Sequence, residues 1–380
     1  MAASALAGAP RRRTCSGSTT APTMAVRLSA ILLSSICLLV LLNASHVESA
    51  RTSGSFHWYN GLFVFGDSFA DTGNFLKADL SEVTRQWYKP YGCSHGFLRD
   101  PTGRFSNGFV QSDFIAKILG RTKAPETYRD TKENNGDKFG VNFAVGGAGV
   151  FEVPRKAPTL AKQISSFKKM LDGGDIGKWQ LKESVALVAI SGNDYARVAN
   201  MSSESEILDF IGNVTDEIAG GVERLQKLGV TKVLVNTLHP LACTPWQARP
   251  SNYTKCMGRG NMAALLHNDD LEKKLNATSS DSVYLLDLNW AFTNIIDPSN
   301  PHDIPQVAKQ FKSKLKPCCE SFDPNGYCGQ VDEDGGALYS VCSNPEKHFF
   351  WDDVHPTQAG WEAVMEQLKK DIKDFLHITY

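Results

Sequence analysis

Five short runs of apolar, often β-branched residues constrain the fold of this chain more than any other feature. Each run is continuous rather than alternating, which is typical of strands that are buried on both faces of a sheet. Segments with apolar residues three and four positions apart separate the runs and predict helices. The runs are 62–65, 139–145, 185–190, 232–236 and 283–288, and the helical segments are 109–119, 160–171, 204–228, 262–275 and 358–375.

This alternation of strands and helices predicts right-handed βαβ units and one parallel sheet that is covered on both faces. No Pro-, Gly- or Ser-rich boundary and no internal repeat divides the chain after residue 50, so we expect residues 51–380 to form a single domain. In sheets of this kind, ligands bind at the carboxyl ends of the strands. Residues that carry chemistry should therefore follow the apolar runs directly.

The first fifty residues have the layout of a secretory signal peptide. Arginines come first, residues 28–42 form an uncharged apolar stretch, and small residues follow at Ser49 and Ala50. A signal that begins at Met24 would be complete by itself. The stretch is slightly shorter than the roughly 20 residues of a spanning helix. We therefore expect cleavage, secretion and no stable membrane span in the mature chain, with an uncleaved anchor in the Golgi lumen as the alternative.

The cysteines and glycosylation sequons agree with secretion. Two of the nine cysteines lie in the leader, and most of the other seven should form disulfides in an oxidising compartment, with at least one thiol left over. We expect Cys243 to pair with Cys256 because they are close in sequence. The cysteine cluster at 318–342 also suggests zinc, but it lacks the ligand spacing of zinc sites, so a disulfide-stapled loop is favoured. Four sequons predict N-glycosylation at Asn200, Asn213, Asn252 and Asn276.

The charges are nearly balanced. The chain has 40 lysines and arginines against 41 aspartates and glutamates. Without residues 1–50, which hold four arginines and one glutamate, the net charge is a mild −4. This balance gives no basic surplus for nucleic acid, so we expect no nucleic-acid partner.

Candidate catalytic residues follow the first three strands. Ser68 stands in Gly-Asp-Ser after the first run, Gly146 opens Gly-Gly-Ala-Gly after the second, and Asn193 stands in Ser-Gly-Asn-Asp after the third. A serine in such a turn presents its hydroxyl at the sheet edge, while a glycine N–H and an asparagine amide can donate to an oxyanion. Taken singly, the three motifs also fit a plain turn, a loop and a helix cap. The glycine run lacks the GxGxxG spacing of a dinucleotide site.

A candidate base lies near the end of the chain. Histidine is the usual general base at neutral pH, and it needs an acceptor on its other nitrogen. Asp352 precedes His355 by three residues, so one helical turn would bring the two side chains together. Asp353 is the rival acid, with worse one-turn geometry, and an ordinary surface Asp–His pair is the alternative.

One motif is a decoy. Ser94 lies in Gly-Cys-Ser-His-Gly, which matches the GxSxG nucleophile elbow. That elbow needs a buried strand before it and a helix after it. The surrounding segments, with prolines at positions 90 and 101, fit neither. We therefore do not expect Ser94 to be a nucleophile.

Together, these segments resemble the plant GDSL esterase/lipase family of the SGNH hydrolase superfamily. The blocks FVFGDSFADTGN, NFAVGGAG, SGND and FFWDDVHPT stand in the order of that family, and the likeness runs from Phe63 to about Ala363. It implies an α/β fold: a flavodoxin-like three-layer α/β/α sandwich with a five-stranded parallel sheet. Phe69 replaces the leucine of the family motif, while Val145 and His239 stand where the family more often has serine and proline.

The resemblance also implies the roles of the candidate residues. Ser68 is the nucleophile, His355 its base and Asp352 the residue that orients the base. The N–H groups of Ser68 and Gly146 and the side chain of Asn193 form the oxyanion hole. The family chemistry requires no metal and no organic cofactor.

The substrate class follows less closely from the sequence. A small-molecule, polysaccharide or lipid ester is the expected partner. Because we see no long apolar lid segment, we expect a short acyl group, such as an acetyl ester of cell-wall polysaccharide. A lipase or acyltransferase that acts on fatty-acyl esters is one alternative, and an inactive polysaccharide- or lipid-binding protein on the same scaffold is another.

Overall fold

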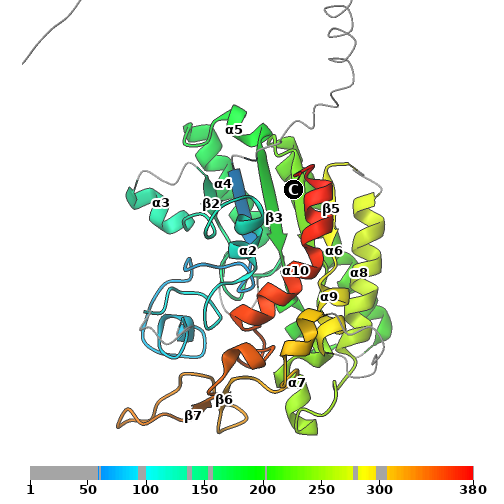
Figure 1. The fold of residues 1–380 in the computed structure, drawn as a ribbon. Helices are drawn as coiled ribbons and strands as arrows, with labels where there is room; N and C mark the ends of the chain where they lie inside the picture. The colour runs from blue at the N-terminus through cyan, green and yellow to red at the C-terminus, as the bar shows by residue number, and fades with distance from the viewer. Residues whose placement is uncertain are drawn as a thin grey trace, which may run out of the picture. The chain divides into compact units, whose positions relative to one another are not determined.

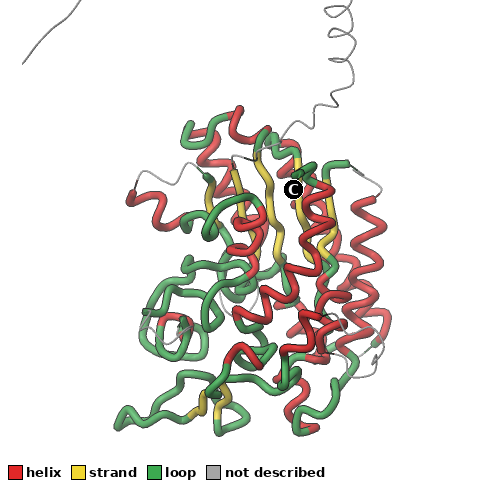
Figure 2. The backbone as a smooth tube through the Cα atoms, viewed as in Figure 1, coloured by secondary structure: helices red, strands yellow, loops and turns green. Residues whose placement is uncertain are grey.

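Five parallel strands form the predicted sheet in a computed structural model of the chain (Figure 2). The structure describes Tyr59 and residues 61–92, 100–134, 139–152, 157–201, 203–276, 281–296 and 306–379. The strand order is β2-β1-β3-β4-β5. The strands are β1 (Gly61–Gly66), β2 (Gly140–Asn142), β3 (Ser184–Ala189), β4 (Lys232–Asn236) and β5 (Val283–Leu286).

Helices cover both faces of the sheet, and Figure 1 shows α10 in front of it. One face packs against α2 (Gln111–Ile118), α9 (Leu288–Ile296) and α10 (Gln358–Phe375). The other face packs against α4 (Leu160–Gly173), α6 (Glu204–Lys227) and α8 (Gly260–Asn276). The shorter helices are α3 (Tyr128–Asn134), α5 (Lys178–Lys182), α7 (Pro245–Ala248), η2 (Arg85–Trp87), η3 (Asn193–Asn200), η4 (Leu241–Cys243), η5 (Arg249–Ser251), η6 (Gln306–Gln310) and η7 (Pro345–Lys347).

The continuous apolar runs reflect burial on both faces. Successive side chains of a strand point to opposite faces. In β1, Leu62 and Val64 belong to the core under α2 and α10, whereas Phe63 and Phe65 belong to the core under α4 and α6. All four side chains are fully buried. The predicted three-layer α/β/α fold is confirmed.

The fifth run shows where the sequence prediction stops too late. The run 283–288 predicts one strand, but β5 ends at Leu286, and Leu288 begins α9. The side chain of Asp287 accepts a hydrogen bond from the N–H of Trp290 at 2.9 Å. This is the contact of a helix N-cap, and it turns the chain out of the strand.

Three disulfides form among the described cysteines. Cys243 pairs with Cys256, as predicted. Two more bonds, Cys318–Cys342 and Cys319–Cys328, staple the C-terminal loop region. There the structure adds an antiparallel pair that the sequence analysis missed, β6 (Cys319–Ser321) and β7 (Tyr339–Val341), which lies below the sheet in Figure 1. Strands of three residues are too short to leave a periodic signal.

Some predictions fall outside the described residues. These are the signal peptide at 1–50 and the decoy serine at 94, and Cys93, one of the seven cysteines after the leader, lies outside them as well. From Phe56 to Tyr380 the chain forms one compact unit. Within the part that is described, no helix combines the length and the apolar character that a membrane span needs.

A buried ion pair fixes the start of α2. Arg104 donates from Nε and Nη2 to the two carboxylate oxygens of Asp113, both at 2.8 Å. Asp113 also accepts the main-chain N–H groups of Val110 and Ala124 at 3.0 Å. Burial alone would raise the pKa of Asp113, but the charge and hydrogen bonds of Arg104, with these N–H groups, lower it overall.

We predict that Asp113→Asn lowers the free energy of unfolding by about 3 kcal/mol at pH 7, because it breaks a buried pair. A carboxyl whose pKa is lowered by folding contributes stability above its unfolded pKa of about 3.9 and loses it as the pH falls further. The gap between wild type and variant should therefore narrow below about pH 4. Urea unfolding at pH 7 and at pH 3 measures the difference in free energy of unfolding between wild type and variant. A difference of equal size at both pH values would contradict a lowered pKa of Asp113.

Candidate active site

The turn after β1 carries Ser68 to the carboxyl edge of the sheet. Gly66 closes the strand at φ +141°, and a Cβ atom there would lie 2.1 Å from the carbonyl oxygen of Ala189 in β3. Only glycine fits this close approach of two strands. The next N–H, of Asp67, donates to the same carbonyl at 3.0 Å. These contacts fix the backbone directly before Ser68 at the edge of the sheet.

Ser68 and His355 meet although 287 residues separate them in the chain. His355 Nε2 lies 2.8 Å from Ser68 Oγ. His355 Nδ1 lies 2.8 Å from Oδ1 and 3.0 Å from Oδ2 of Asp352. All three side chains are buried. Because a carboxylate only accepts, Nδ1 carries the proton, which leaves Nε2 free to accept the serine proton.

The loop between Asp352 and His355 is a turn rather than the predicted helical turn. Asp352 Oδ1 accepts the N–H groups of Val354 at 3.0 Å and His355 at 2.8 Å. This contact holds the acid and the imidazole in one small loop. The N–H of Trp351 also donates to the carbonyl of His355, at 2.7 Å. The rival acid, Asp353, points elsewhere: its Oδ1 accepts from Arg85 Nη2 at 2.9 Å.

Asp67, directly before Ser68, joins the first and third motifs. Its Oδ2 accepts from the N–H and the hydroxyl of Ser191, both at 2.6 Å, and from Asn193 Nδ2 at 3.1 Å. Its Oδ1 accepts from the N–H of Phe69 at 3.1 Å. Full burial, against these hydrogen bonds, raises the pKa of Asp67 to about 6. Asp67 thus holds Asn193 beside the turn that carries Ser68.

The main-chain N–H of Gly146 is not free to reach an oxyanion, contrary to the sequence prediction. It donates to Asp71 Oδ2 at 2.8 Å. Asp71 also accepts the N–H groups of Gly73 and Asn74, so it ties the loop after Ser68 to the glycine run. A Cβ atom at Gly146 would lie 2.5 Å from the ring of Phe105, and that ring stacks on His355 at 4.8 Å. Gly146 is therefore a packing position.

Gly147 is the glycine that lines the cavity with Ser68. Its φ of +78° turns the backbone in a way that suits glycine. The two glycines stand side by side in the sequence, and no pattern tells which one faces the cavity. The two glycines differ because Asp71 accepts a hydrogen bond from the N–H of Gly146.

A cavity of about 650 Å³ opens over Ser68. The predicted residues Ser68, Asn193 and His355 line it, while Asp352 lies behind His355. Trp246, whose side chain is 63% exposed, also lines the cavity. Polar side chains that line it as well are Glu82, Arg85, Gln247, Asn325 and Asp353.

His239, one of the three residues that depart from the family pattern, lines this cavity too. It is 2% exposed and packs against the rings of Phe69 and Phe292 at 5.0 and 5.3 Å. Burial, with His355 nearby, lowers the pKa of His239 to about 3. Neither of its ring nitrogens has a hydrogen-bond partner among the described residues. A neutral imidazole therefore offers one donor and one acceptor beside Ser68.

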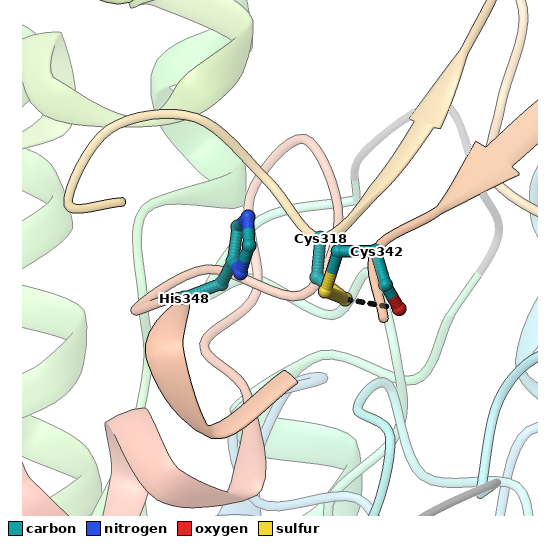
Figure 3. A group of neighbouring side chains, drawn as sticks. All are labelled: Cys318, Cys342 and His348. Atoms are coloured by element: carbon teal, nitrogen blue, oxygen red, sulfur yellow. Dashed lines mark hydrogen bonds between the residues drawn. A yellow bond between two sulfur atoms is a disulfide. The ribbon is translucent and has the colours of Figure 1, made fainter. Parts of the chain in front are cut away.

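Among the described residues, two clusters have the composition of metal sites. In the first, the sulfurs of Cys318 and Cys342 are bonded to each other beside His348, so they are not thiolate ligands (Figure 3). The favoured stapled loop is thus what the structure has. In the second cluster, the oxygens of Asp352 and Asp353 already face His355 and the guanidinium of Arg85. Neither donor set fits a cation.

Comparisons with known proteins agree with the geometry. The sequence model of the family described as GDSL-like Lipase/Acylhydrolase matches residues 62–368. One GDSL esterase/lipase of Arabidopsis thaliana is 39% identical over 82% of this chain and 86% of its own. A second from the same plant is 36% identical over 83% of this chain and 88% of its own.

The solved structures are more distant. The acetylxylan esterase Axe2 from Geobacillus stearothermophilus is 14% identical, with a TM-score of 0.36 over 84% of this chain and 95% of that chain. A TM-score this low carries no conclusion about substrate.

The contacts of the two neighbouring acids predict unequal effects of removing them. Asp352→Asn should lower kcat on a model ester by about 10⁴-fold, because the amide favours the wrong tautomer of His355. Asp353→Asn, which removes a half-exposed partner of Arg85, should lower it by less than about tenfold. Steady-state rates of the two isosteric variants test this. A larger loss in Asp353→Asn would mean that Asp353, rather than Asp352, orients His355.

Proposed function

Because the chain belongs to the GDSL-like lipase/acylhydrolase family and is an ester hydrolase, we propose that its acyl-enzyme forms on Ser68, with His355 as base and Asp352 as the residue that orients the base. The single observation that carries this proposal is the distance of 2.8 Å between His355 Nε2 and Ser68 Oγ. It lies within the range that proton transfer needs.

The chemistry follows from the contacts of these three residues. Ser68 Oγ attacks the ester carbonyl while Nε2 of His355 takes the hydroxyl proton, and Asp352 stabilises the imidazolium that results. His355 then gives that proton to the departing alcohol oxygen, which leaves the acyl group on Ser68. A water molecule then gives a proton to His355 Nε2 and attacks the acyl carbon. The bond between that carbon and Ser68 Oγ breaks, His355 returns the proton to Ser68 Oγ, and the carboxylic acid leaves. No step needs a metal or an organic cofactor.

The oxyanion hole combines three donors. Ser68 contributes its main-chain N–H, and Gly147, in place of Gly146, contributes a second. Asn193 Nδ2 donates one proton to the carbonyl of Ala148 at 2.9 Å and the other, over the longer 3.1 Å, to Asp67. The developing oxyanion competes for this second proton. Each such donor is worth about 10²–10³ in rate.

The proposed location is the secretory pathway, with residues 1–50 as the signal and 51–380 as the mature domain. Three disulfides among the described residues support an oxidising compartment. Asn213, Asn252 and Asn276 are exposed, as glycan acceptors must be. The side chain of the fourth acceptor, Asn200, lies outside the described residues.

The proposed substrate is a short-chain ester of a polar alcohol, such as an acetylated cell-wall polysaccharide. An exposed aromatic ring, Trp246, stands at the cavity and suits the flat apolar face of a sugar ring. Polar and acidic side chains, Gln247, Asn325 and Glu82, line the same cavity. They offer hydrogen bonds to the hydroxyl groups of a sugar.

We predict that kcat/KM falls with acyl length across a series of p-nitrophenyl esters from acetate to dodecanoate, and that the enzyme releases acetate from acetylated xylan. Purified, secreted wild-type protein serves for both measurements. Preference for long chains with no acetate release would overturn the substrate class and favour a lipase or an acyltransferase.

Ser68→Ala is the control for the enzyme assignment itself. It removes one hydroxyl and should lower hydrolysis of p-nitrophenyl acetate by at least about 10³-fold, leaving only the rate that binding and the oxyanion donors supply. Unchanged hydrolysis by this variant would mean that another residue is the nucleophile.

A further inference from the structure

The carboxylate that orients His355 has a second set of partners on its far side. Asp352 Oδ2 accepts hydrogen bonds from Tyr91 Oη at 2.7 Å and from Arg85 Nη2 at 3.3 Å. Arg85 Nε donates to the same Tyr91 Oη at 2.7 Å. The guanidinium therefore reaches the carboxylate twice, directly and through the phenol. Neither Arg85 nor Tyr91 belongs to the family blocks quoted above.

This arginine is a buried charge. Its side chain is 2% exposed, and Tyr91 is fully buried. Besides Asp352 and Tyr91, its partners are the carbonyl of Glu82 at 2.8 Å and Asp353 Oδ1 at 2.9 Å. A charge that is shielded from water acts on its neighbours more strongly than a surface charge does. Its centre also lies 5.7 Å from the ring of Phe105, which stacks on His355.

We propose that Arg85 and Tyr91 are positioning residues that extend catalysis to lower pH, by opposing the pull of Asp352 on the His355 proton. This inference rests on the proposed roles of Ser68, His355 and Asp352. It adds two residues, from a segment outside the recognised motifs, that act through the acid.

Arg85 and Tyr91 act on the protonated form of His355. Asp352 stabilises the imidazolium, which is useful during the reaction, but an imidazolium in the free enzyme cannot accept the Ser68 proton. A cation close to an imidazole disfavours its protonated form. A phenol that donates to Asp352 also leaves less negative charge for the Nδ1 proton. Both effects weaken the pull of Asp352 on the Nδ1 proton of His355.

The ionisation of the two buried partners agrees with this arrangement. Burial alone would raise the pKa of Asp352, but His355 and Arg85 lower it well below its ordinary value. Burial raises the pKa of Tyr91 well above its ordinary value, although Arg85 opposes this. The carboxylate is therefore ionised and the phenol protonated throughout the pH range of an assay, so the network itself does not titrate there.

Other titratable groups face His355 at one end of the network and Arg85 at the other. Asp67, Asp353 and His239 lie close enough to His355 to interact with its charge. Glu82 and Tyr327 face Arg85 in addition to the partners already named. None of these side chains is altered in the variants at positions 85 and 91. Arg85→Met also removes the cation that pairs with Asp353, whereas Tyr91→Phe leaves that ion pair, so a shift shared by the two variants reports the contacts with Asp352.

The test is the pH dependence of kcat/KM for p-nitrophenyl acetate between pH 5 and 9. In Arg85→Met, which removes the charge but keeps a similar volume, we expect the midpoint of the acid limb to move up by about one pH unit. In Arg85→Lys, which keeps the charge, it should stay close to wild type. KM should change little in both variants, because the effect acts on the base rather than on ester binding.

Tyr91→Phe is the second variant, because it removes a single hydroxyl and should fold even if Arg85→Met does not. Without the phenol proton, Asp352 attracts the imidazolium more strongly, so the acid limb should again move up, by less than in Arg85→Met. Near-ultraviolet circular dichroism shows whether each variant is folded.

Lys274→Met is the matched control for loss of a positive charge. Lys274 forms ion pairs with Asp216 and Asp270 at 2.7 and 2.9 Å and does not line the cavity. It should lower stability without moving the acid limb. An acid limb that stays in place or moves down in folded Arg85→Met or Tyr91→Phe would overturn the inference. Wild-type hydrolysis that does not depend on Ser68 would instead overturn the proposed function.

Discussion

The hydrogen bond between Ser68 and His355 is the contact on which the rest of the structure depends. It joins the turn after the first strand to a loop just before the last helix, and its two partners are 287 positions apart in the sequence. The parallel sheet makes this possible, because every strand ends at the same edge. Local devices then set the geometry: a glycine where β1 meets β3, and an aspartate that holds the N–H groups of its own turn.

Four buried carboxylates, three of them near this contact, have different tasks because their partners differ. Asp67 and Asp71 accept hydrogen bonds from neutral groups, and burial raises the pKa of each to about 6. They connect the motifs to one another. Asp352 faces two basic groups and stays ionised, which suits the acid of a catalytic triad. Asp113, paired with Arg104, secures the start of a helix instead. The same residue type thus connects loops, supplies the proposed catalytic acid and caps a helix.

Much of the fold can be predicted from sequence because double-faced burial leaves a visible signal. The runs at 62–65 and 232–236 coincide with β1 and β4 to within one residue at each end, and the segment 358–375 is α10. Ser68 could be predicted because it follows such a strand in a known motif, and His355 because its motif stands directly before the predicted helix at 358–375. Their roles as nucleophile and base stay predictions until activity is measured.

The remaining features depend on contacts between distant residues. Gly146 and Gly147 are indistinguishable in the sequence, and only the carboxylate of Asp71 decides which N–H is already taken. Arg85 and Tyr91 stand in a segment without motif or periodicity, yet they touch a residue more than 260 positions away. The strand pair β6–β7 depends on disulfides whose pairing a sequence does not specify.

The most direct measurement of the central claim is the site of covalent labelling by an active-site phosphonate, located by mass spectrometry of peptides. A serine next to a competent base should react stoichiometrically, so the account predicts one label, on Ser68, that His355→Ala abolishes. Labelling of a different residue, or undiminished labelling of Ser68 in His355→Ala, would contradict it.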